Sequence, residues 1–223
     1  MSHLTEDLVQ RYAMSFLQKH YSRKSIGSSF FAKEEVRTKK EYGSKRADGL
    51  LVFRHWLWGQ YVVSMEAKSF KTMPALKPRL DPYKLMWNSL KMGGAICLLS
   101  GSYLALFRMS DGLFQYLFPL NVFIWSALFY GWVTYKSNRH KIVNVIEQLM
   151  QYPANEQWLA FSVDSFEKLS KEDQKILKSI SKFEGVGILL VKPSGKVKRL
   201  IKASSSIKWW GSYTKYYSLR FQK

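Results

Sequence analysis

Apolar residues near the start of the chain recur with the spacing of an amphipathic helix. The residues that share one face are Leu4, Leu8, Tyr12, Phe16 and Leu17. Ser2 or Thr5 is placed to cap the first turn, where Glu6 and Asp7 complement the helix dipole. The pattern predicts a helix from Leu4 to Tyr21.

Two short apolar runs further along the chain have the composition of β-strands. Leu50–Phe53 and Tyr61–Met65 flank the segment Arg54–Gln60, which contains a glycine and two tryptophans. This spacing favours an antiparallel hairpin with its turn near Trp58. A shorter strand is expected around Phe30, Phe31 and Val36.

The middle of the chain contains two long uncharged stretches, Met92–Phe107 and Leu113–Tyr135. A helix needs roughly 20 apolar residues to cross a bilayer. The second stretch reaches that length alone, and the first reaches it with its flank back to Leu85. We therefore expect a two-helix transmembrane hairpin over 85–136, with a pair of buried core helices as the alternative.

After the uncharged stretches the pattern alternates between helix and strand. The expected elements are a helix over Asn138–Tyr152, a strand over Trp158–Val163, a helix over Ser170–Phe183, and strands over Gly187–Lys192 and Val197–Ile201. The chain is thus predicted to be an α/β protein. Its two halves, 1–84 and 137–223, would be separated by the inserted hairpin.

The chain is strongly basic, because 35 lysines and arginines outnumber 16 acidic residues and give a formal charge of +19. Such a charge indicates anionic partners, either nucleic acid or anionic lipid. A basic set before the strand hairpin is a candidate phosphate-contacting surface: Lys33, Arg37, Lys39, Lys40, Lys45 and Arg46. The basic, aromatic tail from Ser204 is suited to stacking on bases, to lying at a membrane surface, or to packing.

Basic residues also set the expected orientation in a membrane. The outer ends of the hairpin carry Lys84, Lys91, Lys136, Arg139 and Lys141, whereas its connector carries only Arg108 and Asp111. The positive-inside rule then places both termini in the cytoplasm. A bacterial inner membrane is the expected location, and the hairpin is a candidate surface for homo-oligomers. No signal peptide is expected, and the single cysteine, Cys97, excludes an intramolecular disulfide.

Candidate chemistry lies at the ends of the two central strands. Asp48 precedes the first strand, and the triplet Glu66-Ala67-Lys68 closes the second. Mg²⁺ prefers oxygen ligands and accepts one or two carboxylates. Asp48, Glu66 and the carbonyl of Ala67 are therefore candidate metal ligands, and Lys68 is placed to orient water or stabilise developing charge. The alternative is that Glu66 and Lys68 form an ordinary solvated strand end.

These residues, Asp48 in RADG and Glu66-Ala67-Lys68 in SMEAKS, resemble the PD-(D/E)xK nuclease superfamily, although Ala47 stands in place of its proline. The resemblance covers about 1–72 and 138–203. It implies a restriction-endonuclease-like fold, with a mixed sheet flanked by helices, and an enzyme that hydrolyses DNA with Mg²⁺ or Mn²⁺. It also implies that Glu6 supports the metal site, with Asp7 less favoured. More loosely, Gln148 in the Gln-x-x-x-Tyr pattern ending at Tyr152 would join the site, with Gln151 and Gln157 as alternatives.

Other chemistries fit the sequence less well. The four histidines show no zinc-ligand spacing with Cys97, and neither a phosphate-binding glycine loop nor a nucleophile elbow is present. We therefore expect a membrane-anchored, metal-dependent DNA endonuclease that clears foreign DNA or processes DNA at the membrane. The alternatives are an inactive nuclease-like protein that tethers nucleic acid to a membrane, and a membrane interaction or scaffold protein.

Overall fold

The computed structural model describes residues 4–107, 112–206 and 213–217. The chain forms two compact units: a sheet unit made of residues 1–78 and 143–223, and a hairpin unit made of residues 79–142. The hairpin unit begins and ends a few residues outside the expected range of 85–136. The cause is a short ribbon in which β4 (Arg79–Leu80) pairs antiparallel with β5 (Lys141–Ile142).

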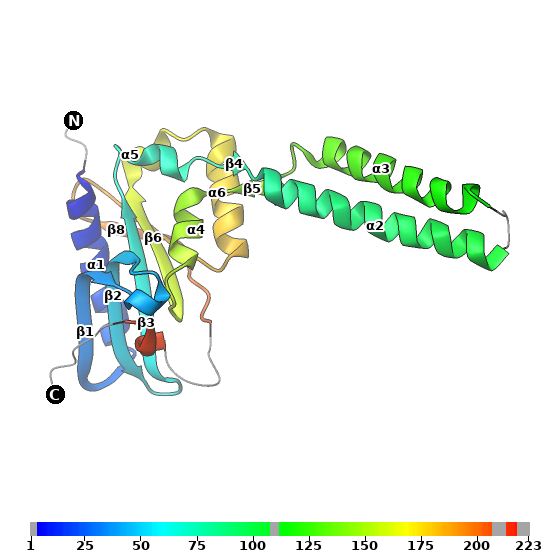
Figure 1. Cartoon of the computed structure of the whole chain (residues 1–223). Helices are drawn as coiled ribbons and strands as arrows, with labels where there is room; N and C mark the ends of the chain where they lie inside the picture. Colours follow the sequence, from blue (N-terminus) through cyan, green and yellow to red (C-terminus); the bar gives the residue numbers. More distant parts are fainter. Residues whose placement is uncertain (1–3, 108–111, 207–212, 218–223) are drawn as a thin grey trace. The chain divides into compact units, whose positions relative to one another are not determined.

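The sheet unit is built on a six-stranded mixed sheet in the order β1-β2-β3-β6-β7-β8 (Figure 1). The strands are β1 (Ser25–Arg37), β2 (Arg46–His55), β3 (Gly59–Lys68), β6 (Glu156–Ser162), β7 (Gly187–Val191) and β8 (Val197–Ile201). The first three run antiparallel, β3, β6 and β7 run parallel, and β8 returns antiparallel. The expectation of a mixed α/β sheet flanked by helices is confirmed.

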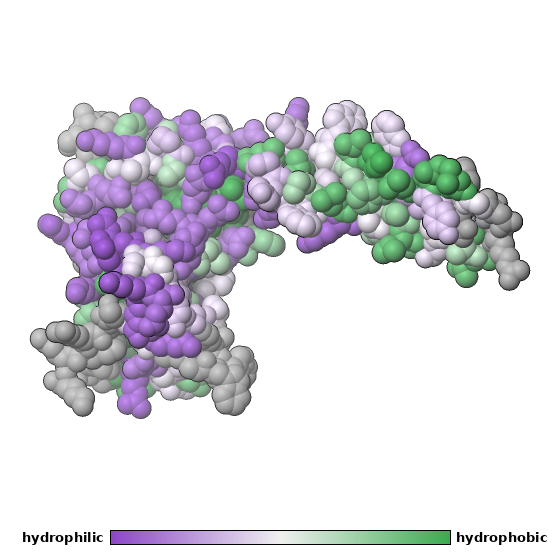
Figure 2. All heavy atoms as spheres, viewed as in Figure 1, coloured by the Kyte–Doolittle hydropathy of each residue, from purple (hydrophilic) through white to green (hydrophobic). Residues whose placement is uncertain are grey.

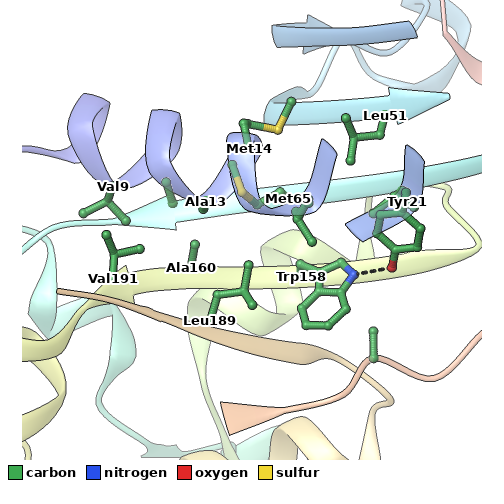
Figure 3. Packing of buried hydrophobic residues seen from close by; sticks show 14 of the residues in the cluster. Val9, Ala13, Met14, Tyr21, Leu51, Met65, Trp158, Ala160, Leu189 and Val191 are labelled. Carbon is green, nitrogen blue, oxygen red and sulfur yellow. Dashed lines mark hydrogen bonds between the residues drawn. The ribbon is translucent and has the colours of Figure 1, made fainter. Parts of the chain in front are cut away.

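One face of the sheet is covered by α1 (Glu6–Ser22), which begins at its N-cap Thr5. Figure 3 shows side chains of α1, among them Met14, pointing at the central strands, where Met65 and Trp158 are buried. Alternate residues of a strand point to opposite faces. Ala67, the middle residue of the Glu-x-Lys triplet, accordingly lies in the core under α1.

The opposite face carries three helices: α4 (Asn144–Met150), α5 (Val163–Glu167) and α6 (Lys171–Phe183). They pack over β6 and β7, and the segment that includes the short helix η4 (Tyr213–Tyr216) packs over β1 to β3. Tyr217 is buried there, and its hydroxyl donates to the Pro153 carbonyl at 2.9 Å. Of the three roles considered for the tail, packing therefore holds for Tyr213–Tyr217, whereas Trp209 and Trp210 lie outside the described residues.

The helix expected over Asn138–Tyr152 is wrong as a single element. The structure instead has a 3-10 turn, η3 (Asn138–His140), then β5, and only then α4. Apolar periodicity continues through Ile142, but its backbone pairs with Arg79, a partner that no local pattern indicates. The short helix α5, capped by Ser162, was not expected, and β1 is longer than expected. Two further 3-10 turns are η1 (Lys40–Tyr42) and η2 (Met73–Leu76).

The hairpin unit consists of α2 (Pro82–Phe107) and α3 (Phe114–Thr134). Both helices are long and apolar enough to cross a membrane, and only 11% and 6% of their most apolar windows are buried. Figure 2 shows hydrophobic side chains on the surface of these helices and mainly hydrophilic ones on the sheet unit. Within the described residues, the two helices therefore lack the burial of soluble core helices. The connector residues Arg108 and Asp111 lie outside the described part of the chain.

Candidate active site

The two strands that carry the expected chemistry form the predicted antiparallel hairpin. Their register pairs His55 with Gly59 at the turn and Gly49 with Met65 at the other end. Asp48 precedes Gly49 on β2 and Glu66 follows Met65 on β3, so both acidic residues lie just beyond this last pair. The sequence expectation that these strand ends meet is therefore confirmed.

Asp48 holds the two strand ends together through its carboxylate. Its Oδ2 atom accepts a hydrogen bond from the Ala67 backbone N–H at 2.8 Å, where the ladder between β2 and β3 has ended. The carbonyl oxygen of Asp48 accepts from Gln10 Nε2 of α1 at 2.9 Å. Asp48 is thus fixed from both sides, and it lines the pocket described below.

Glu66 and Lys68 form a buried ion pair, with 2.8 Å between Glu66 Oε1 and Lys68 Nζ. Glu66 is 1% exposed and Lys68 is 9% exposed, so the alternative of a solvated strand end is wrong. Lys68 Nζ also lies 3.4 Å from Glu6 Oε1, at the N-terminus of α1. Thr72 holds the second oxygen of Glu6 by donating to it at 3.1 Å.

Gln148 of α4 also contacts these charged residues. Its Nε2 atom donates to Glu66 Oε1 at 2.8 Å and to the Tyr152 hydroxyl at 3.2 Å. Tyr152 in turn donates to the Arg46 carbonyl at 2.5 Å, which ties α4 to the start of β2. Of the alternatives to Gln148, Gln157 instead donates to backbone carbonyls at the end of α4.

These side chains line one open pocket of about 390 Å³. Its lining residues are Glu6, Lys45, Arg46, Asp48, Glu66, Lys68, Gln148, Gln151 and Tyr152. Every side chain expected at the site is present, while the less favoured Asp7 is exposed and does not line the pocket. Sequence reasoning missed Gln10 and Thr72, whose role depends on contacts with residues far away in the chain.

The buried charges change one another's protonation. Burial raises the pKa of Glu66 to about 7, and the neighbouring Asp48 adds to this, against the pull of Lys68. Burial also raises the pKa of Asp48, although the Ala67 amide and Lys68 oppose it. Burial alone would lower the pKa of the Lys68 ammonium, but the neighbouring Glu66 carboxylate outweighs burial and raises that pKa. Lys68 is therefore a cation at neutral pH, and Glu66 is close to its midpoint.

The donor set fits a hard divalent cation. Glu66 Oε2 is buried and has no hydrogen-bond partner among the described residues, which is costly unless a ligand satisfies it. In an extended strand the amide and carbonyl of one residue point to the same side, so the Ala67 carbonyl faces Asp48 as its amide does.

In residues 4–107, 112–206 and 213–217, no group of three or more His, Cys, Asp or Glu side chains is arranged to hold a metal. Mg²⁺ needs fewer, since one or two carboxylates suffice when water and substrate complete its shell. Asp48, Glu66 and the Ala67 carbonyl are an adequate set by that criterion.

Comparisons of this chain with protein-family models, with curated proteins and with solved structures found no match in any of the three. The function is therefore inferred from the site itself.

Proposed function

We propose that this chain is a membrane-anchored, Mg²⁺-dependent DNA endonuclease. The observation that carries the proposal is the convergence of Asp48, Glu66 and Lys68 in one pocket, where one carboxylate oxygen of Glu66 has no hydrogen-bond partner among the described residues. Two carboxylates that can hold a metal ion and one lysine ammonium, in a pocket with further basic residues, are the groups that metal-dependent phosphodiester hydrolysis requires. The proposal includes a restriction-endonuclease-like fold for the sheet unit.

The order of the elements supports the resemblance to the PD-(D/E)xK superfamily. An acid on the first helix, an Asp at a strand start, Glu-x-Lys at the next strand end and a following helix–strand unit come in that order. Ala47 replaces the family's proline, and it is fully buried in the core beneath α4. The departure therefore lies in a packing position and leaves the charged groups in place.

A bound Mg²⁺ or Mn²⁺, held by Asp48, Glu66 and the Ala67 carbonyl, would polarise the scissile phosphate and make water a better nucleophile. Lys68 presents a fixed positive charge to the phosphate and can orient the attacking water. Glu6 holds Lys68 in place, and Gln148 fixes the Glu66 carboxylate.

Lys45 and Arg46 border the same pocket and would bind the flanking phosphates of the substrate. Their contacts would not distinguish one base sequence from another, because phosphate contacts position a nucleic acid without identifying its bases. The site therefore suits hydrolysis with little dependence on sequence.

The hairpin unit would anchor the enzyme. Basic residues flank the outer ends of both helices, which favours a topology with the sheet unit in the cytoplasm. DNA would then be cleaved next to the bilayer, most simply at a bacterial inner membrane during clearance of foreign DNA or DNA processing. Pairing of hairpins between two copies would add oligomers to this arrangement.

The test uses the full chain in detergent, with closed circular DNA and end-blocked linear DNA as substrates. We expect cleavage of both with Mg²⁺, none with EDTA, and loss of cleavage in Glu66→Ala. Glu147→Ala, an exposed acid one residue from Gln148, is the matched control and should cleave normally. Salt-sensitive DNA binding without cleavage would support the rival tether, and cleavage of RNA alone would change the substrate class.

A further inference from the structure

The turn between β2 and β3 displays large apolar side chains at the end of the sheet opposite the pocket. Trp56 is 69% exposed, Leu57 is 54% exposed and Trp58 is 39% exposed. Ile26, at the start of β1, is 52% exposed, and its neighbour Ser25 pairs with His55 next to the turn. We call Ile26 and Trp56–Trp58 the apolar tip.

The apolar tip is an ordered part of the fold. The Leu57 backbone N–H donates to His55 Nδ1 at 3.2 Å, which closes the turn. The ring of His55 stacks with Trp56 at 6.3 Å and packs against Tyr61 at 5.3 Å. Gly59 has a φ of 67°, a conformation that favours glycine, and it leads the chain back into β3. The fold therefore holds these apolar side chains outward.

The surroundings of the tip are basic. Segments 22–26 and 54–60 contain no acidic residue, and they contribute Arg23, Lys24 and Arg54. Glu156 is the acidic residue whose charge affects the pKa of His55. Glu156 is 5% exposed, and both of its oxygens accept hydrogen bonds from tyrosine hydroxyls. Among the described residues, Arg23, Lys24 and Arg54 form no ion pair, so the tip combines an apolar surface with positive charge.

The tip is separate from the pocket. Trp58 and Glu66 are near the two ends of β3, roughly 25 Å apart at the rise of an extended strand. A substrate phosphate bound in the pocket would therefore not contact this turn. An exposed apolar cluster of this kind marks a contact with a partner or a membrane.

We propose that the apolar tip inserts into the headgroup region of an anionic bilayer, as a second membrane contact besides the hairpin unit. Tryptophan favours the interface between headgroups and acyl chains. Leu57 and Ile26 cannot stack on bases as aromatic rings do, so they favour lipid over nucleic acid. Arg23, Lys24 and Arg54 match the negative charge of anionic lipid headgroups. The inference rests on the membrane attachment in the proposed function and is independent of nuclease activity.

The test places an environment-sensitive nitrobenzoxadiazole dye on Leu57→Cys in the full chain, with the only native cysteine removed by Cys97→Ala. The matched control carries the dye on Ser194→Cys, an exposed position in the turn between β7 and β8. Both are reconstituted in nanodiscs of phosphatidylcholine alone or with about one third phosphatidylglycerol, the lipid that supplies the negative surface charge. We expect a blue shift and quenching by brominated lipid at position 57 in the anionic discs, and neither at position 194.

Replacing Arg23, Lys24 and Arg54 with glutamine should reduce the quenching at position 57 at least about twofold, because each basic residue contributes to attraction by anionic lipid. Equal emission from both dye positions in both kinds of disc would overturn the proposal, as would a response at position 57 to added DNA and not to lipid. Failure to incorporate into discs would count against the anchor itself. In that case the same two labelled chains, mixed with vesicles of the same compositions, decide the tip contact.

Discussion

At the scale of single residues, Glu66 is the centre of the site. It is buried opposite a second carboxylate, and only one of its oxygens has partners among the described residues. Burying a carboxylate is costly unless a cation or a proton compensates the charge. Lys68 does this on one side, and a divalent cation would do it on the other. The pKa of Glu66 is raised to about 7 because the charge of its carboxylate is only partly compensated.

The first prediction concerns proton release when Mg²⁺ binds. Because the pKa of Glu66 is raised to about 7 by burial and by Asp48, the carboxyl is mostly protonated at pH 6 and mostly ionised at pH 8.5. A cation that binds to Glu66 must displace this proton at the lower pH. Isothermal titration calorimetry in buffers of different ionisation enthalpy should show about one proton released at pH 6 and close to none at pH 8.5.

The control for this measurement is Glu66→Gln, which should bind Mg²⁺ more weakly and lose most of the proton release at pH 6. Equal proton release at pH 6 and pH 8.5 in the wild type would show that Glu66 is not the titrating ligand.

The second prediction concerns stability without metal. The pKa of Glu66 rises from 4.5 in the unfolded chain to about 7 in the folded chain. Between these values the folded chain keeps a proton that the unfolded chain has lost, so the free energy of unfolding falls as the pH rises from 4.5 to 7. The fall is about 3 kcal/mol for this shift. Thermal unfolding in EDTA should show the decline in the wild type and a much smaller one in Glu66→Gln.

At the scale of elements, the central hairpin was predictable because its pattern is local. Leu50–Phe53 and Tyr61–Met65 alternate between two faces, and the acids at their ends mark where the strands meet. Glu6 was expected at the site through the family resemblance, which implies an acidic residue on the first helix. Thr72 and Gln10 were not predictable, since each bonds a residue that only the folded chain brings near. The failed helix over Asn138–Tyr152 has the same cause, because β5 exists only through its pairing with β4.

The third prediction concerns the contact between α2 and α3. A Cβ atom on Gly93 would lie 2.9 Å from the Phe123 carbonyl oxygen and 3.0 Å from Ala127 Cβ, whereas one on Gly94 would have nothing within 4 Å. Gly93→Ala should therefore destabilise the pairing of the helices by about 1–2 kcal/mol, while Gly94→Ala should leave it unchanged.

A titration with SDS measures this difference in a Cys97→Ala background. Energy transfer between dyes on the exposed positions Leu98 of α2 and Trp132 of α3 reports their separation. We expect a lower SDS midpoint for Gly93→Ala than for Gly94→Ala. Equal midpoints for the two variants would mean that the close approach at Gly93 carries no packing energy.

At the scale of the whole molecule, the chain leaves the sheet unit at residue 78 and returns at residue 143. The ribbon of β4 and β5 pairs Leu80 directly with Lys141. Two antiparallel residues paired in this way can be joined by a two-residue turn. The hairpin unit is therefore removable without separating the two halves of the sheet unit.

The fourth prediction follows from this geometry. Replacing residues 81–140 with Asn-Gly should give a folded protein that stays in solution without detergent and cleaves DNA at a rate within about threefold of the full chain, because phosphate contacts supply most of the affinity. Circular dichroism, ultracentrifugation in detergent-free buffer and the cleavage rate check the three parts. A folded but inactive product would show that the hairpin unit contributes to the site.

Asp48, Glu66 and Lys68 are proposed to form a nuclease site, and the initial rate at which three full-length proteins cleave closed circular DNA in Mg²⁺ tests this assignment. We expect the wild type and Lys71→Ala, which changes an exposed lysine close by, to cleave at similar rates. Lys68→Ala should be slower by about 100-fold or more, because the fixed charge beside the phosphate is lost. Equal rates for Lys68→Ala and Lys71→Ala would contradict the assigned site.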